Sequence, residues 1–193
     1  MFYRWLFTSL FALMWGGWAV LWIAMARGVK APAQSESAAS RLSHFGPLIV
    51  GAYLLASPAP QPVPALDVRF VPLAIWPAAL GAAVTFAGLA FCAWARFTIA
   101  ANWSSDVQLK RDHELIVAGP YRWVRHPIYT GILMMFVGTA LAVGQWRAAL
   151  GVALAAAAFW RKLRLEEAVM RTQFGEVYAR YAARVPALIP FVR

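Results

Sequence analysis

Cysteine and histidine are scarce in this 193-residue sequence, which has one Cys and three His. Cys92 lies inside an apolar run, so the chain cannot form an internal disulfide or a thiolate metal site. The histidines make neither a His/Cys cluster nor the H-E-x-x-H spacing of zinc enzymes, and we expect no metal. The glycine-rich signatures of soluble nucleotide-binding folds, G-x-G-x-x-G and G-x-x-x-x-G-K, are also absent.

Acidic residues are few as well. Eight Asp and Glu stand against eighteen Lys and Arg, which gives a net charge of +10. Charged residues make up 13% of the chain and hydrophobic residues 62%, whereas soluble domains average about 45–50% apolar residues. The ten Trp and twelve Phe agree with this bias, because such rings gather at lipid headgroups. The composition excludes an ordinary soluble domain and predicts an all-α integral membrane protein.

Long apolar runs predict about five transmembrane helices. The first run, Phe2 to Ala26, exceeds the apolar part of a typical signal peptide and lacks a convincing cleavage site, so we interpret it as a helix. The second run is short and carries Pro47. The Pro-rich stretch after it, S-P-A-P-Q-P-V-P-A-L-D-V-R-F, predicts an extended loop. The expected helices are 3–27, 42–57, 71–97, 127–144 and 146–161.

The basic residues predict the orientation of these helices. With five spans, fifteen of the eighteen Lys and Arg fall in the segments on one side, 27–41, 96–126 and 161–193. The positive-inside rule then places the N-terminus outside and the C-terminus in the cytoplasm. Anionic lipid headgroups account for the positive charge, and we expect no nucleic acid partner.

Two regions combine many polar residues with neighbouring apolar runs, 102–131 and 161–190. In the first, Pro127 suits the first turn of a helix. This places Arg125 and His126 at the N-terminus of the helix, where backbone N–H groups attract anions, and Tyr129 follows within one turn. The pattern fits either a binding site or an interfacial belt that anchors the helix end.

In the second region, Lys162 and Glu166 are four residues apart and share one helical face, with Glu167 beside them. They are either an ordinary surface pair or a site. In a site, Glu166 suits ribose hydroxyls or an ammonium, and Lys162 suits a carboxylate. An amphipathic helix or lid is predicted after them by an aromatic stripe at helical spacing, made of Phe174, Val177, Tyr178 and Tyr181.

Together the two regions resemble the C-terminal half of the isoprenylcysteine carboxyl methyltransferase family and, more loosely, the phospholipid methyltransferases. The resemblance covers about residues 98 to 193. Its parts, in family order, are N-W-S, H-E-L-I-V-A-G-P-Y-R-W-V-R-H-P-I-Y-T-G, E-E, F-G-E-V-Y-A-R-Y and V-P-A-L-I-P. It implies a methyltransferase that uses S-adenosylmethionine, with a cytoplasmic cofactor pocket built by the C-terminal half.

The resemblance also implies a division of the chain. We expect residues 1–97 to form three transmembrane helices, the second of them short. Residues 98–193 are expected to form the catalytic half, with two transmembrane helices, a cofactor-binding loop and a C-terminal cytoplasmic helix. The N-terminal half is shorter than in the eukaryotic enzymes, which favours a prokaryotic cell membrane.

Each position that matches the family pattern inherits an implied role. A substrate-contacting arginine of the eukaryotic enzymes falls on Lys162, whose ammonium cannot reproduce bidentate carboxylate recognition. We therefore expect Arg125 and Lys162 as the catalytic residues that face the acceptor, with Arg161 and Arg164 as further candidates. The implied cofactor-binding residues are Gln108, His113, Glu114, Leu115, Ile116, Tyr121, His126, Pro127, Ile128, Tyr129 and Glu166.

The chemistry narrows the acceptor. Methyl transfer from a sulfonium depends mainly on positioning. A carboxylate or thiolate is already a nucleophile, whereas an ammonium must first lose a proton to a base. No dedicated base is evident, which favours a lipophilic carboxylate or thiol that enters sideways from the membrane lipid. Three alternatives stay open: a phospholipid or amine N-methyltransferase, a sterol-reductase-like enzyme that uses NADPH, and a non-catalytic membrane protein.

Overall fold

The computed structural model describes residues 2–26, 37–99 and 115–192. Within these ranges the long elements are all helices, so the prediction of an all-α chain is confirmed. The short 3-10 helices are η1 (Pro64–Asp67) and η3 (Gly119–Arg122). The long helices are α1 (Phe2–Ala26), α2 (Ala38–Ala56), α3 (Ile75–Ile99), α4 (Pro127–Val143) and α5 (Trp146–Arg184).

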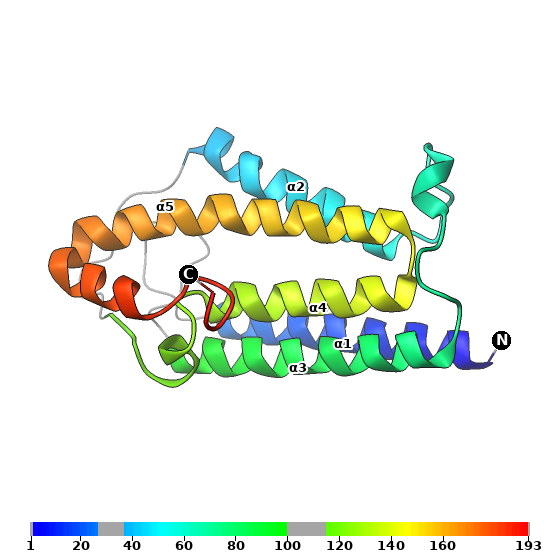
Figure 1. The fold of residues 1–193 in the computed structure, drawn as a ribbon, viewed down its shortest axis with the longest axis horizontal. Helices are drawn as coiled ribbons and strands as arrows, with labels where there is room; N and C mark the ends of the chain where they lie inside the picture. The colour runs from blue at the N-terminus through cyan, green and yellow to red at the C-terminus, as the bar shows by residue number, and fades with distance from the viewer. Residues whose placement is uncertain (1, 27–36, 100–114, 193) are drawn as a thin grey trace.

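Three helices differ from the expected bounds by four residues or more. α3 begins at Ile75 rather than at residue 71. α2 begins at Ala38 rather than at residue 42, because the Ser37 side chain accepts a hydrogen bond from Ser40 N at 3.2 Å and caps the helix. α5 does not stop at residue 161 but continues to Arg184. Its path breaks at Gly175 (φ 50°, ψ −125°), a conformation that glycine adopts at little cost. The last turns of α5 therefore fold back toward α4 (Figure 1).

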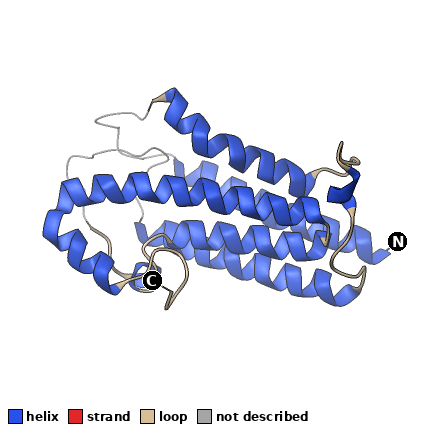
Figure 2. Cartoon of the chain, turned by 45° about the horizontal axis from the view of Figure 1, so that its top comes forward, coloured by secondary structure: helices blue, strands red, loops and turns tan. Residues whose placement is uncertain are grey.

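The helices form an elongated bundle with α4 near its centre (Figures 1 and 2). α4 packs between α3 and α5, while α2 packs on α5 and α1 on α3. Trp15 of α1 also reaches α4, where its Nε1 donates to Thr139 Oγ1 at 3.1 Å and its ring meets Phe136 edge-on. Because α2 and α4 run opposite to the other three helices, the start of α4 and the later part of α5 share one end.

Glycines bring α3 and α4 unusually close together. A Cβ placed on Gly138 would lie 2.4 Å from Gly81 O, and one placed on Gly131 would lie 2.7 Å from Gly88 O. The two pairs belong to the same antiparallel register and lie seven residues apart on each helix. The two backbones are therefore in contact over about two helical turns. Small residues allow such approach between apolar helices, where lipid offers no hydrophobic drive for association.

The opposite end of the bundle is tied by the segment between α2 and α3. Phe70 N donates to Gly144 O at 2.9 Å, and Trp146 N donates to Val68 O at 3.1 Å. Arg147 donates to Leu54 O at 2.6 Å. This segment was expected to be an extended loop, but η1 interrupts it. The contacts fix the tight turn between α4 and α5, where Gly144 takes a left-handed conformation.

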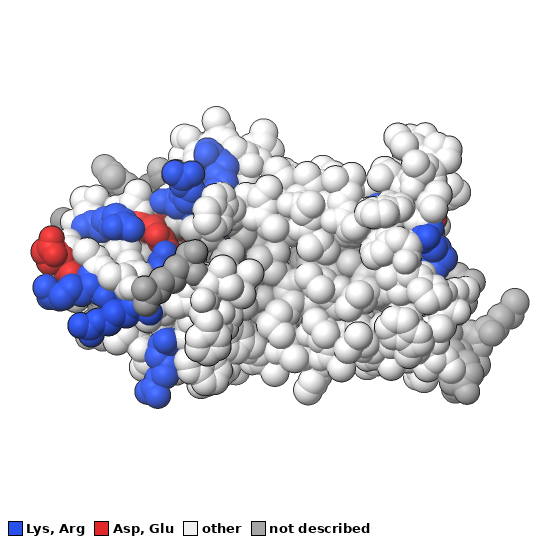
Figure 3. All heavy atoms as spheres, in the orientation of Figure 1, with Lys and Arg blue, Asp and Glu red and all other residues white. Residues whose placement is uncertain are grey.

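The described helices expose far more apolar surface than the helices of a soluble protein do. By length and composition, Trp5–Ala26 and Ile75–Ile99 can cross a membrane, and α4 is apolar but shorter. Only 6% of the apolar window in the first helix is buried, whereas a core helix would be mostly covered. Most of the charged side chains visible in Figure 3 gather at one end of the molecule, a smaller group lies at the other end, and the middle is uncharged.

Exposed tryptophans mark both borders of this uncharged middle. Trp76 and Trp146, at the starts of α3 and α5, are 59% and 53% exposed. Trp94 and Trp160, near the other end, are 44% and 55% exposed. At 1.5 Å per residue the two levels are about 27 Å apart along α3 and about 21 Å apart along α5. This spacing approaches the hydrocarbon thickness of about 30 Å that aromatic belts flank.

The glycine contact predicts a matched pair of substitutions. Gly138→Ala forces a methyl group against the α3 backbone and should lower the free energy of unfolding by about 1–3 kcal/mol. Gly16→Ala should be neutral or stabilising, because nothing lies within 4 Å of the added Cβ and alanine favours the helix. Thermal unfolding in detergent measures both variants. Equal stability of the two variants would contradict the proposed contact.

Candidate functional site

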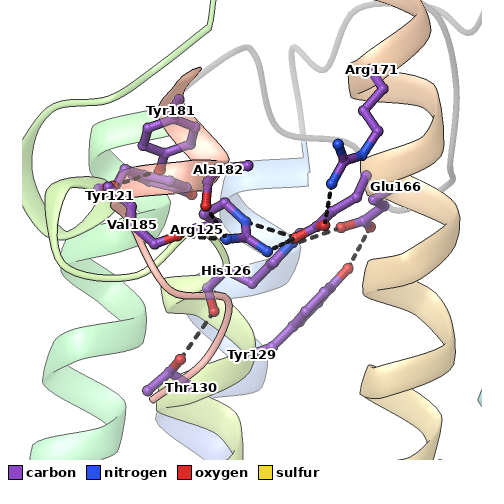
Figure 4. Close-up of polar contacts among 11 residues, drawn as sticks. Tyr121, Arg125, His126, Tyr129, Thr130, Glu166, Arg171, Tyr181, Ala182 and Val185 are labelled. Carbon is purple, nitrogen blue, oxygen red and sulfur yellow. Dashed lines mark hydrogen bonds and ion pairs between the residues drawn. The ribbon is translucent and has the colours of Figure 1, made fainter. Parts of the chain in front are cut away.

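The start of α4 faces the part of α5 that begins at Lys162, at the charged end of the bundle (Figures 1 and 3). Pro127 opens α4 at its first position and His126 is the N-cap residue, because proline fits the first turn, where its missing N–H costs little. The predicted helix start is confirmed. Figure 4 shows Arg125, His126 and Tyr129 directed at acidic side chains of α5.

Glu167 holds the two residues that precede α4. Its Oε1 accepts from Arg125 Nε at 2.8 Å and lies 2.6 Å from Arg125 NH2. The same oxygen is 3.2 Å from His126 Nε2. Arg171, four residues along, lies 3.9 Å from the other oxygen, but its side chain is 57% exposed. Because the Glu167 and Arg125 side chains are only 12% and 13% exposed, water weakens their ion pair little.

Glu166 contacts Tyr129 and the second ring nitrogen of His126. Its Oε1 accepts a hydrogen bond of 2.5 Å from the Tyr129 hydroxyl. Its Oε2 lies 3.5 Å from His126 Nδ1. His126 therefore stands between the two carboxylates, with one ring nitrogen near each. Two helices are joined through one imidazole.

Aromatic rings and Lys162 surround Glu166. The His126 and Tyr129 rings stack at 5.5 Å, and the Tyr129 and Phe159 rings stack at 4.7 Å. The Lys162 Nζ lies 5.4 Å from the Phe45 ring of α2 and 5.8 Å from the Tyr129 ring. Lys162 is 9% exposed, so its ammonium is held in an aromatic setting and not in bulk water. α2, α4 and α5 all contribute to this frame.

A C-terminal strap, residues 185–188, lies against the start of α4. Arg125 N donates to Pro186 O at 2.9 Å, and His126 N donates to Ala187 O at 3.0 Å. Thr130 Oγ1 donates to Leu188 O at 2.7 Å. The Arg125 guanidinium adds hydrogen bonds to Ala182 O and Val185 O. The strap fixes the backbone that carries His126. Its carbonyl groups accept hydrogen bonds from the amides of Arg125 and His126, which were expected to attract anions.

The close packing shifts the protonation of the three central groups. Burial alone would lower the pKa of His126, but hydrogen bonds with Glu166 and Glu167 outweigh it and raise the pKa above its ordinary 6.5. Burial would raise the pKa of Glu166, but the His126 hydrogen bond and the Lys162 charge lower it. Against the same opposition from burial, His126 and Arg125 lower the pKa of Glu167 to about 2. Both carboxylates are therefore ionised at neutral pH.

The structure brings together four of the residues predicted from sequence, His126, Tyr129, Lys162 and Glu166. Pro127 and Ile128 are buried in the core, so their side chains pack inside the bundle. Gln108, His113 and Glu114 lie outside the described residues. Leu115 and Ile116 are half-buried, and Ile116 packs on the core.

Two predicted residues have different partners from those expected. Tyr121 is 7% exposed and directs its hydroxyl to Ala95 O at 3.5 Å. Its own carbonyl accepts from the Tyr181 hydroxyl at 2.6 Å. Arg125 was expected to face the acceptor, but its guanidinium is bound to Glu167 and to the end of α5. Both residues hold structural contacts next to the site.

Sequence reasoning named Glu167 only as a neighbour of Glu166 and gave it no role. The family resemblance assigned only Glu166 of the E-E pair to the site, and a helical pattern predicts that the adjacent Glu167 points about 100° away. His126 lies between these two directions and bonds to both. Phe45 and the strap were missed because their contacts link segments far apart in the chain.

The pKa shifts predict how stability depends on pH. His126, whose folded pKa is raised, stabilises the fold below its ordinary pKa of 6.5, and this contribution is lost as pH rises through the raised value. Glu167 contributes above its ordinary 4.5, and this is lost as pH falls toward about 2. The cluster should therefore stabilise the fold most between these two ordinary values. Denaturant unfolding across pH should show this maximum, and His126→Asn should remove the alkaline decline. An unchanged decline would contradict the assignment.

Comparison with known proteins shows what the chain is similar to. A family model described as the isoprenylcysteine carboxyl methyltransferase (ICMT) family matches residues 80–172. The human protein-S-isoprenylcysteine O-methyltransferase is 33% identical over 102 residues, which cover 51% of this chain and 36% of the human protein. The Arabidopsis thaliana protein-S-isoprenylcysteine O-methyltransferase B is 34% identical over 89 residues, 45% of each chain.

A solved structure agrees with these relatives. It is described as the eukaryotic intramembrane Ras methyltransferase ICMT without a monobody, and it matches with a TM-score of 0.53 at 25% identity. The match covers 80% of this chain and 52% of that one. The aligned part thus spans about half or less of the relatives' length. The resemblance predicted from sequence is confirmed: residues 80–172 match the isoprenylcysteine carboxyl methyltransferase family model, and the relatives and the solved structure carry the same name.

Proposed function

We propose that this chain is an integral membrane methyltransferase that uses S-adenosylmethionine and transfers the methyl group to a lipophilic carboxylate or thiol. The observation that carries the proposal is the placement of Glu166. This carboxylate is ionised, largely buried and held by Tyr129 and His126 inside an aromatic frame. Lys162 stands beside it. A structural ion pair alone would not require that frame.

The residues present fit the proposed cofactor. S-adenosylmethionine carries a sulfonium, an ammonium and ribose hydroxyls, and when bound it supplies an electrophilic methyl group. Glu166 offers a charged acceptor to hydroxyl or ammonium groups. The faces of Tyr129 and Phe159 favour a cation. The backbone N–H of Ile128 adds a donor in the first turn of α4, where Pro127 has none.

Lys162 is the residue that we assign to the acceptor. Its ammonium attracts a carboxylate or thiolate and repels a protonated amine, which disfavours the amine N-methyltransferase alternative. Arg125 is reassigned as a positioning residue, because its guanidinium holds Glu167 and the end of α5. An anionic acceptor needs no base, so the proposed role of the protein is to bring two bound groups into line and keep water out. The O-methyltransferase activity named for the relatives and the carboxyl methyltransferase activity named for the family model support the same class.

The membrane arrangement is part of the proposal. We place all five helices in the bilayer, with the N-terminus outside and the charged end, including the site, in the cytoplasm. The exposed Trp levels and the uncharged middle support this placement (Figure 3). Residues 1–97 would then serve as the membrane half and 98–193 as the catalytic half. A prokaryotic cell membrane remains the proposed location.

Removal of the Glu166 charge tests cofactor binding. Glu166→Gln keeps the size of the side chain but loses charge-assisted hydrogen bonds, each about 1.5–3 kcal/mol. The affinity for S-adenosylhomocysteine should fall about 10- to 100-fold. Calorimetric titration of detergent-purified protein measures this loss.

The matched control for this test is Glu176→Gln, which changes an exposed carboxylate of the same helix. It should bind like the unchanged protein. A thermal melt must show that Glu166→Gln is folded. Unaltered affinity in folded Glu166→Gln would remove Glu166 from the cofactor site, and binding of NADPH in place of the homocysteine compound would favour a reductase.

Replacement of Lys162 tests the acceptor assignment. Lys162→Met keeps the apolar stem and removes the charge, so the KM for an S-prenylcysteine carboxylate should rise about tenfold or more, as expected for loss of a buried ion pair. Affinity for S-adenosylhomocysteine should change much less. Arg180→Met, an exposed cation on the same helix with no proposed part in the site, is the control. Initial-rate kinetics give the result, and an unchanged KM would exclude Lys162 as the acceptor contact.

A further inference from the structure

A short apolar turn follows the strap. We call residues 189–192 the C-terminal turn; Val192 N donates to Ile189 O at 3.2 Å and closes it. The preceding strap is fixed to α4 by the amides of Arg125 and His126 and by Thr130. The turn is therefore carried on a backbone that is bonded to the centre of the bundle, and its direction is set by that attachment.

The turn presents its apolar side chains outward. Phe191 is 100% exposed, and Ile189 and Val192 are 61% and 59% exposed. Phe191 has a φ of 67°, a left-handed conformation that costs a residue with a bulky side chain about 1 kcal/mol or more. A strained backbone that turns an aromatic ring away from the protein indicates an external apolar partner. In water alone, nothing would offset either cost.

The surroundings of the turn indicate which partner this is. The turn lies where the charged end of the molecule meets the uncharged middle (Figures 1 and 3). Trp94 and Trp160 mark the same end with exposed rings. Exposed basic side chains, Arg180 and Arg184, stand on the last turns of α5 just before the strap. Apolar tips flanked by cations and tryptophans are typical of segments that lie in the headgroup boundary of a bilayer.

We propose that the C-terminal turn inserts into the lipid bilayer, with Phe191 as its deepest residue. This inference rests on the membrane placement given under the proposed function. It adds a lipid contact on the cytoplasmic side that no transmembrane helix makes. The strap connects this contact to His126, because Ala187 O accepts a hydrogen bond from His126 N. The bilayer surface is thus the partner of this face of the molecule.

Depth measurement by spin labelling tests the proposal. Single cysteines are introduced at Phe191, Leu13 and Glu176 in a Cys92→Ala background and labelled with a nitroxide. The full chain is placed in nanodiscs that contain anionic lipid. Leu13, 72% exposed in the middle of α1, is the reference for hydrocarbon, and Glu176 is the reference for water. Collision with oxygen, which enriches in lipid, is compared with collision with a water-soluble nickel complex.

The expected result is an oxygen-to-nickel ratio at Phe191→Cys several-fold above that at Glu176→Cys and below that at Leu13→Cys. A ratio at 191 equal to that at 176, with Leu13→Cys still high, would overturn the insertion and leave the membrane placement intact. A low ratio at all three sites would overturn the membrane placement itself. Shielding of 191 from both reagents, with spin broadening that unlabelled protein dilutes away, would assign the turn to a second copy and overturn the lipid contact.

Discussion

The contact between His126 and two adjacent carboxylates is the interaction on which this end of the molecule depends. Glu166 and Glu167 both face an imidazole at the start of α4, and neither charge could stay in this setting without a partner. Arg125 and Tyr129 complete the set. The result is a rigid joint between α4 and α5 in which one carboxylate is used for structure and the other is left beside Lys162 in an aromatic frame.

Packing elsewhere sets where this joint can lie. The contacts between α3 and α4 at Gly81–Gly138 and Gly88–Gly131 fix the height of α4, because a backbone in contact cannot slide without breaking both pairs. At the far end, Arg147 and the hydrogen bonds around Gly144 fix the turn into α5. Glycine contacts hold α4 against α3, and the first turn of α5 is held at the far end. These two constraints bring His126 and Glu166 together although they lie forty residues apart in the chain.

Sequence alone predicted the parts of this arrangement that depend on local rules. Pro127 set the start of α4, and the four-residue spacing of Lys162 and Glu166 placed both on one face of α5. The site residues His126 and Tyr129 followed from the family resemblance. Contacts between distant segments were beyond such rules, which is why the strap on α4 and the part played by Phe45 were missed. The length of α5 was also underestimated, because the polar residues after 161 end an apolar run but do not end a helix.

The position of the site relative to the tryptophans fits the proposed pairing of a polar cofactor with a lipophilic acceptor. Glu166 lies six residues beyond Trp160 on α5, about 9 Å along the helix axis. If Trp160 marks the border of the hydrocarbon, as its exposure supports, the carboxylate lies at headgroup depth. A charged nucleoside cofactor can reach that depth from water without crossing hydrocarbon, which would be costly for its charges. A lipophilic acceptor can reach the same depth while its tail stays among the acyl chains. A site deeper in the bundle would exclude the charged cofactor. A site farther from the bilayer would require the tail of the acceptor to leave the lipid.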